Sequence, residues 1–570
     1  MRKIFNDITL GILAIAIIFL VGCSVQNNLK KCGDGNCSIQ ESKSGKCFID
    51  CKSKEEGNLN DNKQAETKNN TEPIHEEEPV KILPKKISTF DFGIEYGPPG
   101  LAKTYAKTGV HVIKPYPESV MWKNIQGSAS SSYNWANLDR IVREYQDAGF
   151  DKIHLLITAE SKWASRDADG LKAKDTRPKP EYEDDYARFV KAAVERYDMD
   201  GKDDMDGLRY AINEWGVERE LSGFWPGNGA EYVELLKLAY PAIKEANPNA
   251  KVMLNALFMS SMFNGNPDDE EVGRRLGEGK IIGNTKTSMQ DISAILDAVN
   301  YYDVIDVHFL GDYSEIPATM KWLRNEMKER GVEKDVYGGD VFPMSPLFIG
   351  LETCNTGPLA GKEIYPVDSR SRCEAVKLIE SLRNKNDPNY KKAHEWIERN
   401  IAINIPRKFA VSAYEGLSGI NIGNMEDWFI PFGAGTSPYM GLVDTASMLD
   451  SIRKPKEERL GFYAVEMSVK YLDGFDSVRK IENGHNVYAY EFANNGKKII
   501  VAWYDDGGFY GMDSTIQSVD VSMPWEKSSA KLIEVPVKRG DEEGGMRIIN
   551  AENGKLNFKL GYTTVFIIEN

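Results

Sequence analysis

Between about residue 88 and residue 475, short apolar runs of strand length alternate with amphipathic stretches of helical length. Runs that are apolar at nearly every position are typical of strands buried on both faces. Eight strand–helix pairs follow one another at a mean repeat of about 40 residues, and this order predicts an α/β fold, a (β/α)8 TIM barrel. The predicted strands lie near residues 90–95, 110–115, 152–158, 208–213, 251–256, 304–308, 347–352 and 417–422. The predicted helices lie near residues 101–107, 135–148, 186–197, 230–246, 292–299, 318–330, 372–382 and 460–472.

The helical period disappears after about residue 476. Short stretches that alternate or are β-branched take its place, and Asn494-Asn495-Gly496 predicts a tight turn between the first two. We therefore expect residues 88–475 to form the barrel and residues 476–570 to form an antiparallel β-sandwich. The predicted strands of this second domain lie near residues 487–492, 499–504, 516–521, 530–535 and 563–568.

The first 23 residues have the pattern of an export signal. Arg2 and Lys3 precede an apolar stretch over residues 8–22, which is short for a membrane span. The stretch ends in Leu-Val-Gly-Cys, which resembles a bacterial lipobox and implies cleavage before Cys23 and acylation of its thiol. A plain signal peptide or a short uncleaved anchor is the alternative. We expect the rest of the chain to lie outside the cytoplasm, anchored to the membrane through Cys23.

Residues 24–51 form a small cysteine-rich module, and residues 52–87 are polar enough to predict a disordered linker. The cysteine spacing in the module lacks paired Cys-x2-Cys knuckles, so disulfides are favoured over a zinc site. Three connectivities remain open. Another bridge could join Cys354 to Cys373. The four cysteines of the module are Cys32, Cys37, Cys47 and Cys51.

The formal net charge of −15 argues against a nucleic-acid partner, because phosphate binding needs a basic surface. The chain has no phosphate-binding glycine loop and no His-Glu-x-x-His motif, and its six histidines are widely spread. We therefore predict no metal and no cofactor. The acidic turn over residues 198–204 fails the EF-hand spacing, and a solvated turn is the favoured interpretation.

Two glutamates are placed where a barrel carries its chemistry. Glu214 follows the predicted strand 208–213, and Glu352 ends the predicted strand 347–352. Active sites of such barrels gather at the carboxyl ends of the strands, and a pair of carboxylates there is suited to cleaving a glycosidic bond. Glu218 and Glu220 follow closely and compete with Glu214 for the acid role, although we expect them to be solvated. The alternative for each glutamate is a surface position in a loop.

Several motifs, in order, resemble the clan A barrel glycoside hydrolases, which include families 5, 10, 39 and 51. They are Tyr133-Asn134-Trp135, Asn213-Glu214 and Asn247-Pro248-Asn249-Ala250, and the resemblance is strongest to families 39 and 51. It implies that Glu214 is the acid/base and Glu352 the nucleophile. Asn213 would then bind the 2-hydroxyl of the sugar. Because two carboxylates about 5–5.5 Å apart repel each other, we expect the pKa of Glu214 to be raised.

The same resemblance places a histidine or tyrosine beside the nucleophile, and His308 or Tyr313 would fill that position. Three tryptophans at predicted loop positions suit stacking on sugar rings, although each alone suits ordinary packing equally well. They are Trp122, Trp163 and Trp428. At the tips of the first two strands, Glu95 and Lys114 could bind sugar hydroxyls.

These features favour a retaining glycoside hydrolase that cleaves a β-linked oligo- or polysaccharide by double displacement at the cell surface. Two alternatives remain: a carbohydrate-binding lipoprotein without catalysis, and a transglycosylase that uses the same two glutamates. The sequence does not determine the sugar, the linkage, exo or endo action, or the oligomeric state.

Overall fold

The computed structural model describes residues 90–570, apart from residues 117–119, 169–173, 222–223, 278–288, 346–370, 424–425, 428–435, 447–451 and 516. Within this part of the chain, no helix is both long enough and apolar enough to cross a membrane.

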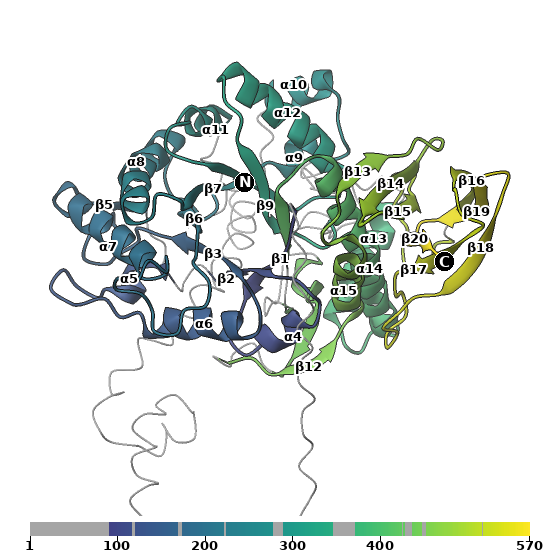
Figure 1. The fold of residues 1–570 in the computed structure, drawn as a ribbon, viewed down its shortest axis with the longest axis horizontal. Helices are drawn as coiled ribbons and strands as arrows, with labels where there is room; N and C mark the ends of the chain where they lie inside the picture. Colours follow the sequence, from purple (N-terminus) through teal and green to yellow (C-terminus); the bar gives the residue numbers. More distant parts are fainter. Residues whose placement is uncertain are drawn as a thin grey trace, which may run out of the picture. The chain divides into compact units, whose positions relative to one another are not determined.

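Eight parallel strands close into a barrel, in the order β1-β10-β9-β8-β7-β6-β3-β2 (Figure 1). Together with the antiparallel domain that follows it, this architecture confirms the predicted fold class. The barrel strands are β1 (Asp91–Gly97), β2 (Val112–Pro115), β3 (Lys152–Ile157), β6 (Glu214–Val217), β7 (Lys251–Phe258), β8 (Val304–Phe309), β9 (Asp335–Val341) and β10 (Gly419–Ile422).

Helices surround the barrel because their buried residues recur on one face and pack against the strands. The principal helices are α4 (Ala102–Ala106), α6 (Ala136–Asp147), α7 (Glu183–Glu195), α8 (Gly229–Ala246), α11 (Met289–Leu296), α12 (Glu315–Glu329), α13 (Ser371–Arg383), α14 (Tyr390–Tyr414) and α15 (Leu460–Leu472). Shorter elements are α5 (Trp122–Ile125), α9 (Ser260–Phe263), α10 (Asp269–Gly277), η3 (Pro180–Tyr182), η4 (Ser437–Tyr439) and the hairpins β4 (Ser165–Asp167) with β5 (Asp175–Pro178) and β11 (Val443–Thr445) with β12 (Pro455–Glu458).

Two barrel strands differ from the prediction. The apolar run over residues 208–213 is a connection before the strand, and its Ile212 is buried with its N–H donating to the Tyr197 carbonyl. The fourth barrel strand, β6, begins only at Glu214. The seventh, β9, lies at residues 335–341, so the prediction that 347–352 fills this place is wrong. Apolar runs in connections misled the prediction, because the barrel interior contains polar side chains.

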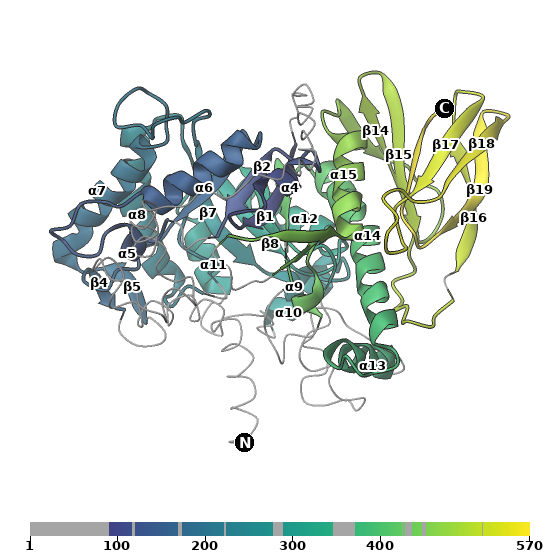
Figure 2. The same cartoon turned by 90° about the horizontal axis from the view of Figure 1, so that it is seen from below.

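The C-terminal domain is an eight-stranded antiparallel sheet, in the order β13-β14-β15-β20-β17-β18-β19-β16, that encloses its own apolar core. Its inner strands also pack on α14 and α15, since Tyr490, Phe492 and Trp503 belong to the core of the barrel layer (Figure 2). The strands are β13 (Ser477–Lys480), β14 (Val487–Asn494), β15 (Lys497–Tyr504), β16 (Ser518–Pro524), β17 (Ser529–Glu534), β18 (Met546–Glu552), β19 (Lys555–Gly561) and β20 (Val565–Glu569).

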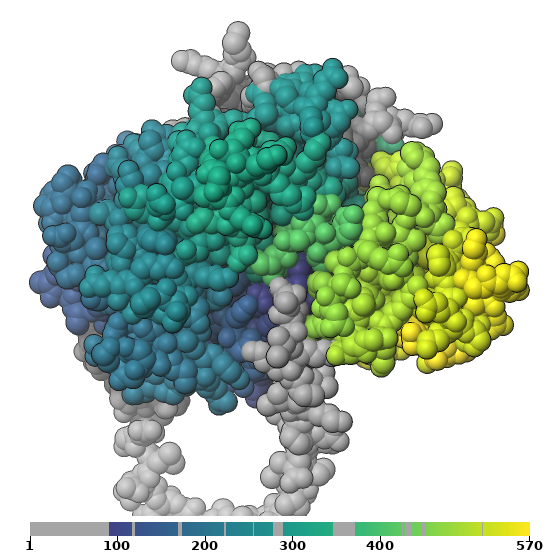
Figure 3. Space-filling model, turned by 45° about the horizontal axis from the view of Figure 1, so that its top comes forward, coloured from purple at the N-terminus to yellow at the C-terminus, as the bar shows by residue number. Residues whose placement is uncertain are grey.

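One buried arginine joins this domain to the barrel. Arg407 of α14 is fully buried, and its Nη1 lies 2.9 Å from Asp505 Oδ2. Its guanidinium also donates to Thr564 Oγ1 and to the Tyr562 carbonyl, and it lies 4.2 Å from the centre of the Tyr562 ring. Figure 3 shows the green-to-yellow β-domain directly against the blue-to-teal barrel.

Candidate active site

Three side chains that can transfer or share protons meet at the carboxyl ends of barrel strands. Asp340 and His308 are paired in register near the ends of β9 and β8, and Glu220 follows the end of β6. His308 Nδ1 lies 2.8 Å from Glu220 Oε2 and 3.9 Å from Asp340 Oδ2. Both distances share the same nitrogen, so the two carboxylate oxygens are at most about 6.7 Å apart; retaining glycosidases need about 5–5.5 Å and inverting ones about 6.5–9.5 Å.

Several buried polar atoms in this cluster have no hydrogen-bond partner among the residues that the structure describes. They include His308 Nε2, Asp340 Oδ1 and Glu95 Oε2. In folded proteins such atoms are rare, because leaving one unpaired costs about 1–3 kcal/mol. Unpaired polar atoms on neighbouring side chains are groups to which the hydroxyls of a ligand can bind.

Glu95 and Lys114 lie in the same cluster, as the sequence predicted, but they contact each other. Lys114 Nζ is 3.1 Å from Glu95 Oε1, and both side chains are buried. Lys114 also donates to the carbonyl of Gly339, the residue before Asp340. Asp306 completes the group, since its Oδ1 accepts from the Gly339 N–H at 2.7 Å.

Burial shifts the pKa values of Asp340 and His308 in opposite directions. Burial raises the pKa of Asp340, and Glu220 and Asp306 raise it further, whereas His308 and Lys114 lower it. Burial lowers the pKa of His308 to about 4. The imidazole is therefore neutral near pH 7, and a neutral ring can donate to an ionised carboxylate or accept from a protonated one.

Glu218 has a different environment from Glu220. It is 1 % exposed and adopts a φ of 68°, and its Oε1 accepts from the Ala159 N–H at 2.7 Å. Burial raises its pKa to about 7. The next residue, Arg219, pairs with Glu160 at 2.9 Å. Glu218 and Arg219 thus hold the connection after β6 against β3, and this leaves Glu220 to face His308. The expectation that Glu218 and Glu220 are solvated is wrong.

Glu214 lies at the other end of the barrel. It is the first residue of β6, in register with His154 and Lys251, so the prediction that it closes the fourth strand is wrong. The strand puts roughly 10 Å between Glu214 and the carboxyl end at Val217. The pKa of Glu214 is raised, as predicted, but by burial and without a catalytic partner; its charged neighbours are Lys152, Asp91, Lys251 and Asp151.

The other predicted site residues divide into three groups. Asn213 shares the amino end with Glu214, where its Oδ1 accepts from Asn247 Nδ2 at 3.1 Å. Trp122 and Tyr313 are buried elsewhere: Trp122 packs against Phe189 of α7, and the Tyr313 hydroxyl donates to Asp505 of the β-domain. Glu352 and Trp428 lie outside the described residues.

Trp163 is half-buried and packs edge-on against Trp122, with its indole N–H donating to the Gln126 carbonyl at 3.2 Å. Its ring therefore contacts the segment that carries Trp122. The expectation that Trp122 stacks on a sugar is wrong, because that ring is fully buried, whereas the same expectation for Trp163 stays a prediction.

Sequence reasoning missed Asp340 and set Glu220 aside. Strand β9 reads Asp-Val-Tyr-Gly-Gly-Asp-Val. Glycine and aspartate are typical of loops, so the sequence did not indicate a strand there. A signal was present: the stretch follows helix α12 at the usual spacing and ends at Phe342-Pro343, so Asp340 stands at the end of a strand-length segment.

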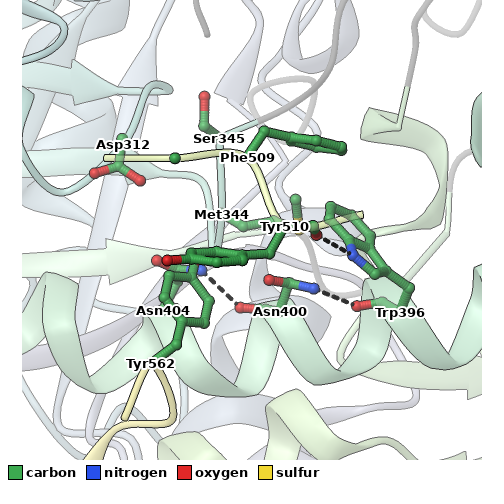
Figure 4. Close-up of a pocket in the computed structure, with 10 residues that line it drawn as sticks. Asp312, Met344, Ser345, Trp396, Asn400, Asn404, Phe509, Tyr510 and Tyr562 are labelled. Carbon is green, nitrogen blue, oxygen red and sulfur yellow. Dashed lines mark hydrogen bonds between the residues drawn. The ribbon is translucent and has the colours of Figure 1, made fainter. Parts of the chain in front are cut away.

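A pocket lies at the junction of the barrel and the β-domain, next to the segments that follow β8 and β9 (Figure 4). Trp396, Asn400 and Asn404 line it from one face of α14, and hydrogen bonds join Asn404 to Asn400, Asn400 to Trp396 and Trp396 to Tyr510. Aromatic rings and amides in one pocket are the groups that commonly contact sugars. The remaining lining residues are Asp312, Met344, Ser345, Gly508, Phe509, Tyr510 and Tyr562.

The carboxylates of Asp198, Asp200 and Asp204 lie within 4.8 Å of one another, which is close enough to share a cation. They accept hydrogen bonds from backbone N–H groups of their own turn: Asp204 from residues 199 and 201, Asp198 from residue 200, and Asp200 from residue 202. Burial and the neighbouring acids raise the pKa of Asp198 to about 6. The local bonds account for the turn without a metal ion.

No family model matches the chain, and a search of curated proteins gives no match either. Solved structures do match. A family 39 glycoside hydrolase from the gut symbiont Bacteroides cellulosilyticus WH2 is 13% identical, with a TM-score of 0.51 over 86% of this chain and 83% of that one. A conserved exported protein from Bacteroides fragilis is 9% identical, with a TM-score of 0.50 over 85% and 98%.

A family 51 α-L-arabinofuranosidase from Thermotoga petrophila RKU-1 is 11% identical, with a TM-score of 0.46 over 86% of this chain and 98% of that one. Identities this low establish a likeness of fold. The chain thus has the barrel and trailing β-domain found in glycoside hydrolases of clan A.

Proposed function

We propose that this protein is a glycoside hydrolase in which Glu220 and Asp340 are the catalytic carboxylates. The observation that carries the proposal is the meeting of Glu220, His308 and Asp340 at the carboxyl ends of barrel strands, where His308 Nε2 and Asp340 Oδ1 have no partner among the described residues. The pair takes over the roles that the sequence suggested for Glu214 and Glu352. The likeness of fold to a family 39 glycoside hydrolase supports the same reaction class.

The two carboxylates would act in sequence. Asp340, ionised, attacks the anomeric carbon, while Glu220 protonates the oxygen of the departing sugar. Glu220 then takes a proton from water, which opens the ester to Asp340 and gives net retention. His308 suits this cycle because its neutral ring can hydrogen-bond to Glu220 in both of its protonation states.

The surroundings support a neutral glycan as the substrate. Four carboxylates gather in the cluster, those of Glu95, Glu220, Asp306 and Asp340, and an anionic sugar would be repelled by them. β-Linked, uncharged polysaccharides at the cell surface fit these features.

The first experiment measures turnover of a panel of aryl β-glycosides and the configuration of the first product by ¹H NMR. We expect Glu220→Gln to lose about 10²–10⁴-fold in kcat/KM on sugars with poor leaving groups, and much less on dinitrophenyl glycosides, which need no acid. Asp340→Asn should lose activity on both kinds of substrate. The first product should retain its configuration.

Glu214→Gln is the matched control, since it is the same substitution at the first residue of β6, whereas Glu220 follows the other end of that strand. It should keep near-normal activity. Glu352→Gln tests the nucleophile suggested by the sequence. A loss of activity in Glu214→Gln or Glu352→Gln that equals the loss in Glu220→Gln or Asp340→Asn would refute the assignment. Binding of glycans without turnover in the unmutated protein would favour a carbohydrate-binding role instead.

We also propose that the protein is exported and held at the membrane by a lipid on Cys23. The proposal is supported by the charged start, the short apolar stretch and the cysteine that follows it. A long polar segment over residues 52–87 would then separate the anchor from the barrel.

A further inference from the structure

A buried lysine lies beside the candidate nucleophile. Lys114 of β2 is 3 % exposed. Its ammonium group is 3.1 Å from Glu95 and donates to the Gly339 carbonyl at 3.0 Å, directly before Asp340 in β9. Gly423 shows how close Glu95 and Asp340 are, because a Cβ added there would lie 3.1 Å from Glu95 Cβ and 3.4 Å from Asp340 Oδ1.

Asp340 is surrounded by more acids than bases. The charged or titratable groups that act on it are His308 and Asp306 of β8, Lys114 of β2, Glu220 after β6, Glu95 of β1 and Lys408 of α14. His308 is neutral near pH 7, so among the residues that the structure describes the two lysines are the cations that offset the three other carboxylates. Lys408 is already engaged, since its Nζ donates to the carbonyls of Phe309 and Gly311 at 3.0 and 2.7 Å.

We propose that Lys114 is a positioning residue of the catalytic centre, whose ammonium group, fixed by Glu95 and the Gly339 carbonyl, holds Asp340 in the ionised form that attack on a sugar requires. The inference rests on the proposed function. In this inference Glu95 fixes the position of Lys114, whereas the sequence suggested that Glu95 binds sugar hydroxyls.

The sign of the effect follows from the charges. A buried carboxyl is disfavoured as an anion, and an opposite charge nearby lowers its pKa by about 1–3 units. Removing Lys114 should therefore raise the pKa of Asp340, whereas removing the competing charge of Glu95 should lower it. An ion pair with only a structural role would behave differently, because either single substitution breaks the same pair and both should have the same effect.

The test compares the acid limb of kcat/KM against pH, which reports ionisation of the nucleophile in the free enzyme. In Lys114→Met we expect this limb to move up by about one pH unit or more, and in Glu95→Gln to move down. The double variant Lys114→Met/Glu95→Gln should regain thermal stability, and its acid limb should lie between the limbs of the two single variants. Lys152→Met is the control, since Lys152 pairs with Asp91 at the amino ends of the strands and should leave the limb unchanged. An unmoved limb in Lys114→Met, with turnover intact, would overturn the inference and leave the proposed function standing.

A second measurement does not depend on turnover. The pKa of Glu95 and of Asp340 is raised in the folded protein, so both groups weaken the fold as the pH rises above their unfolded values, near 4. Without Lys114 this loss should grow, so the midpoint difference between Lys114→Met and the unmutated protein should widen from about pH 4 to about pH 8. A constant difference would overturn the inference. If the midpoint difference widens with pH but the unmutated protein has no glycosidase activity, only the proposed function is refuted.

Discussion

Replacing Arg407 by methionine should loosen the β-domain from the barrel. The substitution leaves Asp505 buried without its cation and removes the donors to Thr564 and to the Tyr562 carbonyl. Breaking a buried ion pair by removing one partner costs about 3–5 kcal/mol. An unfolding entropy of about 2.1 cal/mol/K per residue makes each kcal/mol worth about 1 °C for a cooperative unit of this size, so we expect the thermal midpoint to fall by about 3–5 °C.

Calorimetry of the full chain measures this shift, and Arg188→Met is the matched control. Arg188 pairs with Asp185 on the surface of α7 with 64% of its side chain exposed, and such pairs contribute about 0–1 kcal/mol. Its midpoint should move by less than 1 °C. Equal shifts in the two variants would show that the Arg407 contacts contribute no more than a surface pair, and the reasoning about the junction would be refuted. A second, separate transition in Arg407→Met would support it.

Gly423→Ala should reduce kcat at least tenfold with little change in the midpoint, because the new methyl would press on Glu95 Cβ and Asp340 Oδ1 at 3.1 and 3.4 Å; kinetics beside calorimetry checks this, and unchanged kcat would contradict the proposed place of Asp340. Cys23→Ser should abolish labelling of the protein by radioactive palmitate in cells and release it from the membrane fraction. Labelling that persists in Cys23→Ser would rule out this anchor.

The barrel could be predicted from the sequence because six of its eight strands are apolar runs between amphipathic helices. The fourth was placed too early, because the apolar run over residues 208–212 precedes β6. The seventh was missed for a different reason. Polar groups fill the interior of this barrel: a side chain on Gly339 would meet the Asp306 carboxylate at 2.3 Å, so β9 needs glycine where an apolar residue would mark a strand. An apolar run that the prediction took for a strand, residues 208–212, lies in a connection before β6.

The sequence predicted the positions of some residues of the candidate site and not of others. His308, Glu95 and Lys114 were predicted near the carboxyl ends of their strands because those strands are apolar runs. The sequence predicted that the fourth strand ends just before Glu214, whereas β6 begins there. Glu214 was therefore preferred over Glu220 as the residue at the carboxyl end. The pairing of Glu220 with His308 depends on a chain reversal at Glu218, where φ is 68°, and a local sequence pattern does not indicate such a conformation in a glutamate.

Helix α14 has a consequence for dividing the protein. Eighteen of its 25 residues are buried, as expected for a helix covered on opposite sides, by the barrel layer and by the β-domain. A truncated chain that stops after α15 would expose one of those sides to water, including the otherwise enclosed guanidinium of Arg407. The hundred or so C-terminal residues thus complete the burial of α14 beside the barrel, and they are unsuited to exchange as a detachable module.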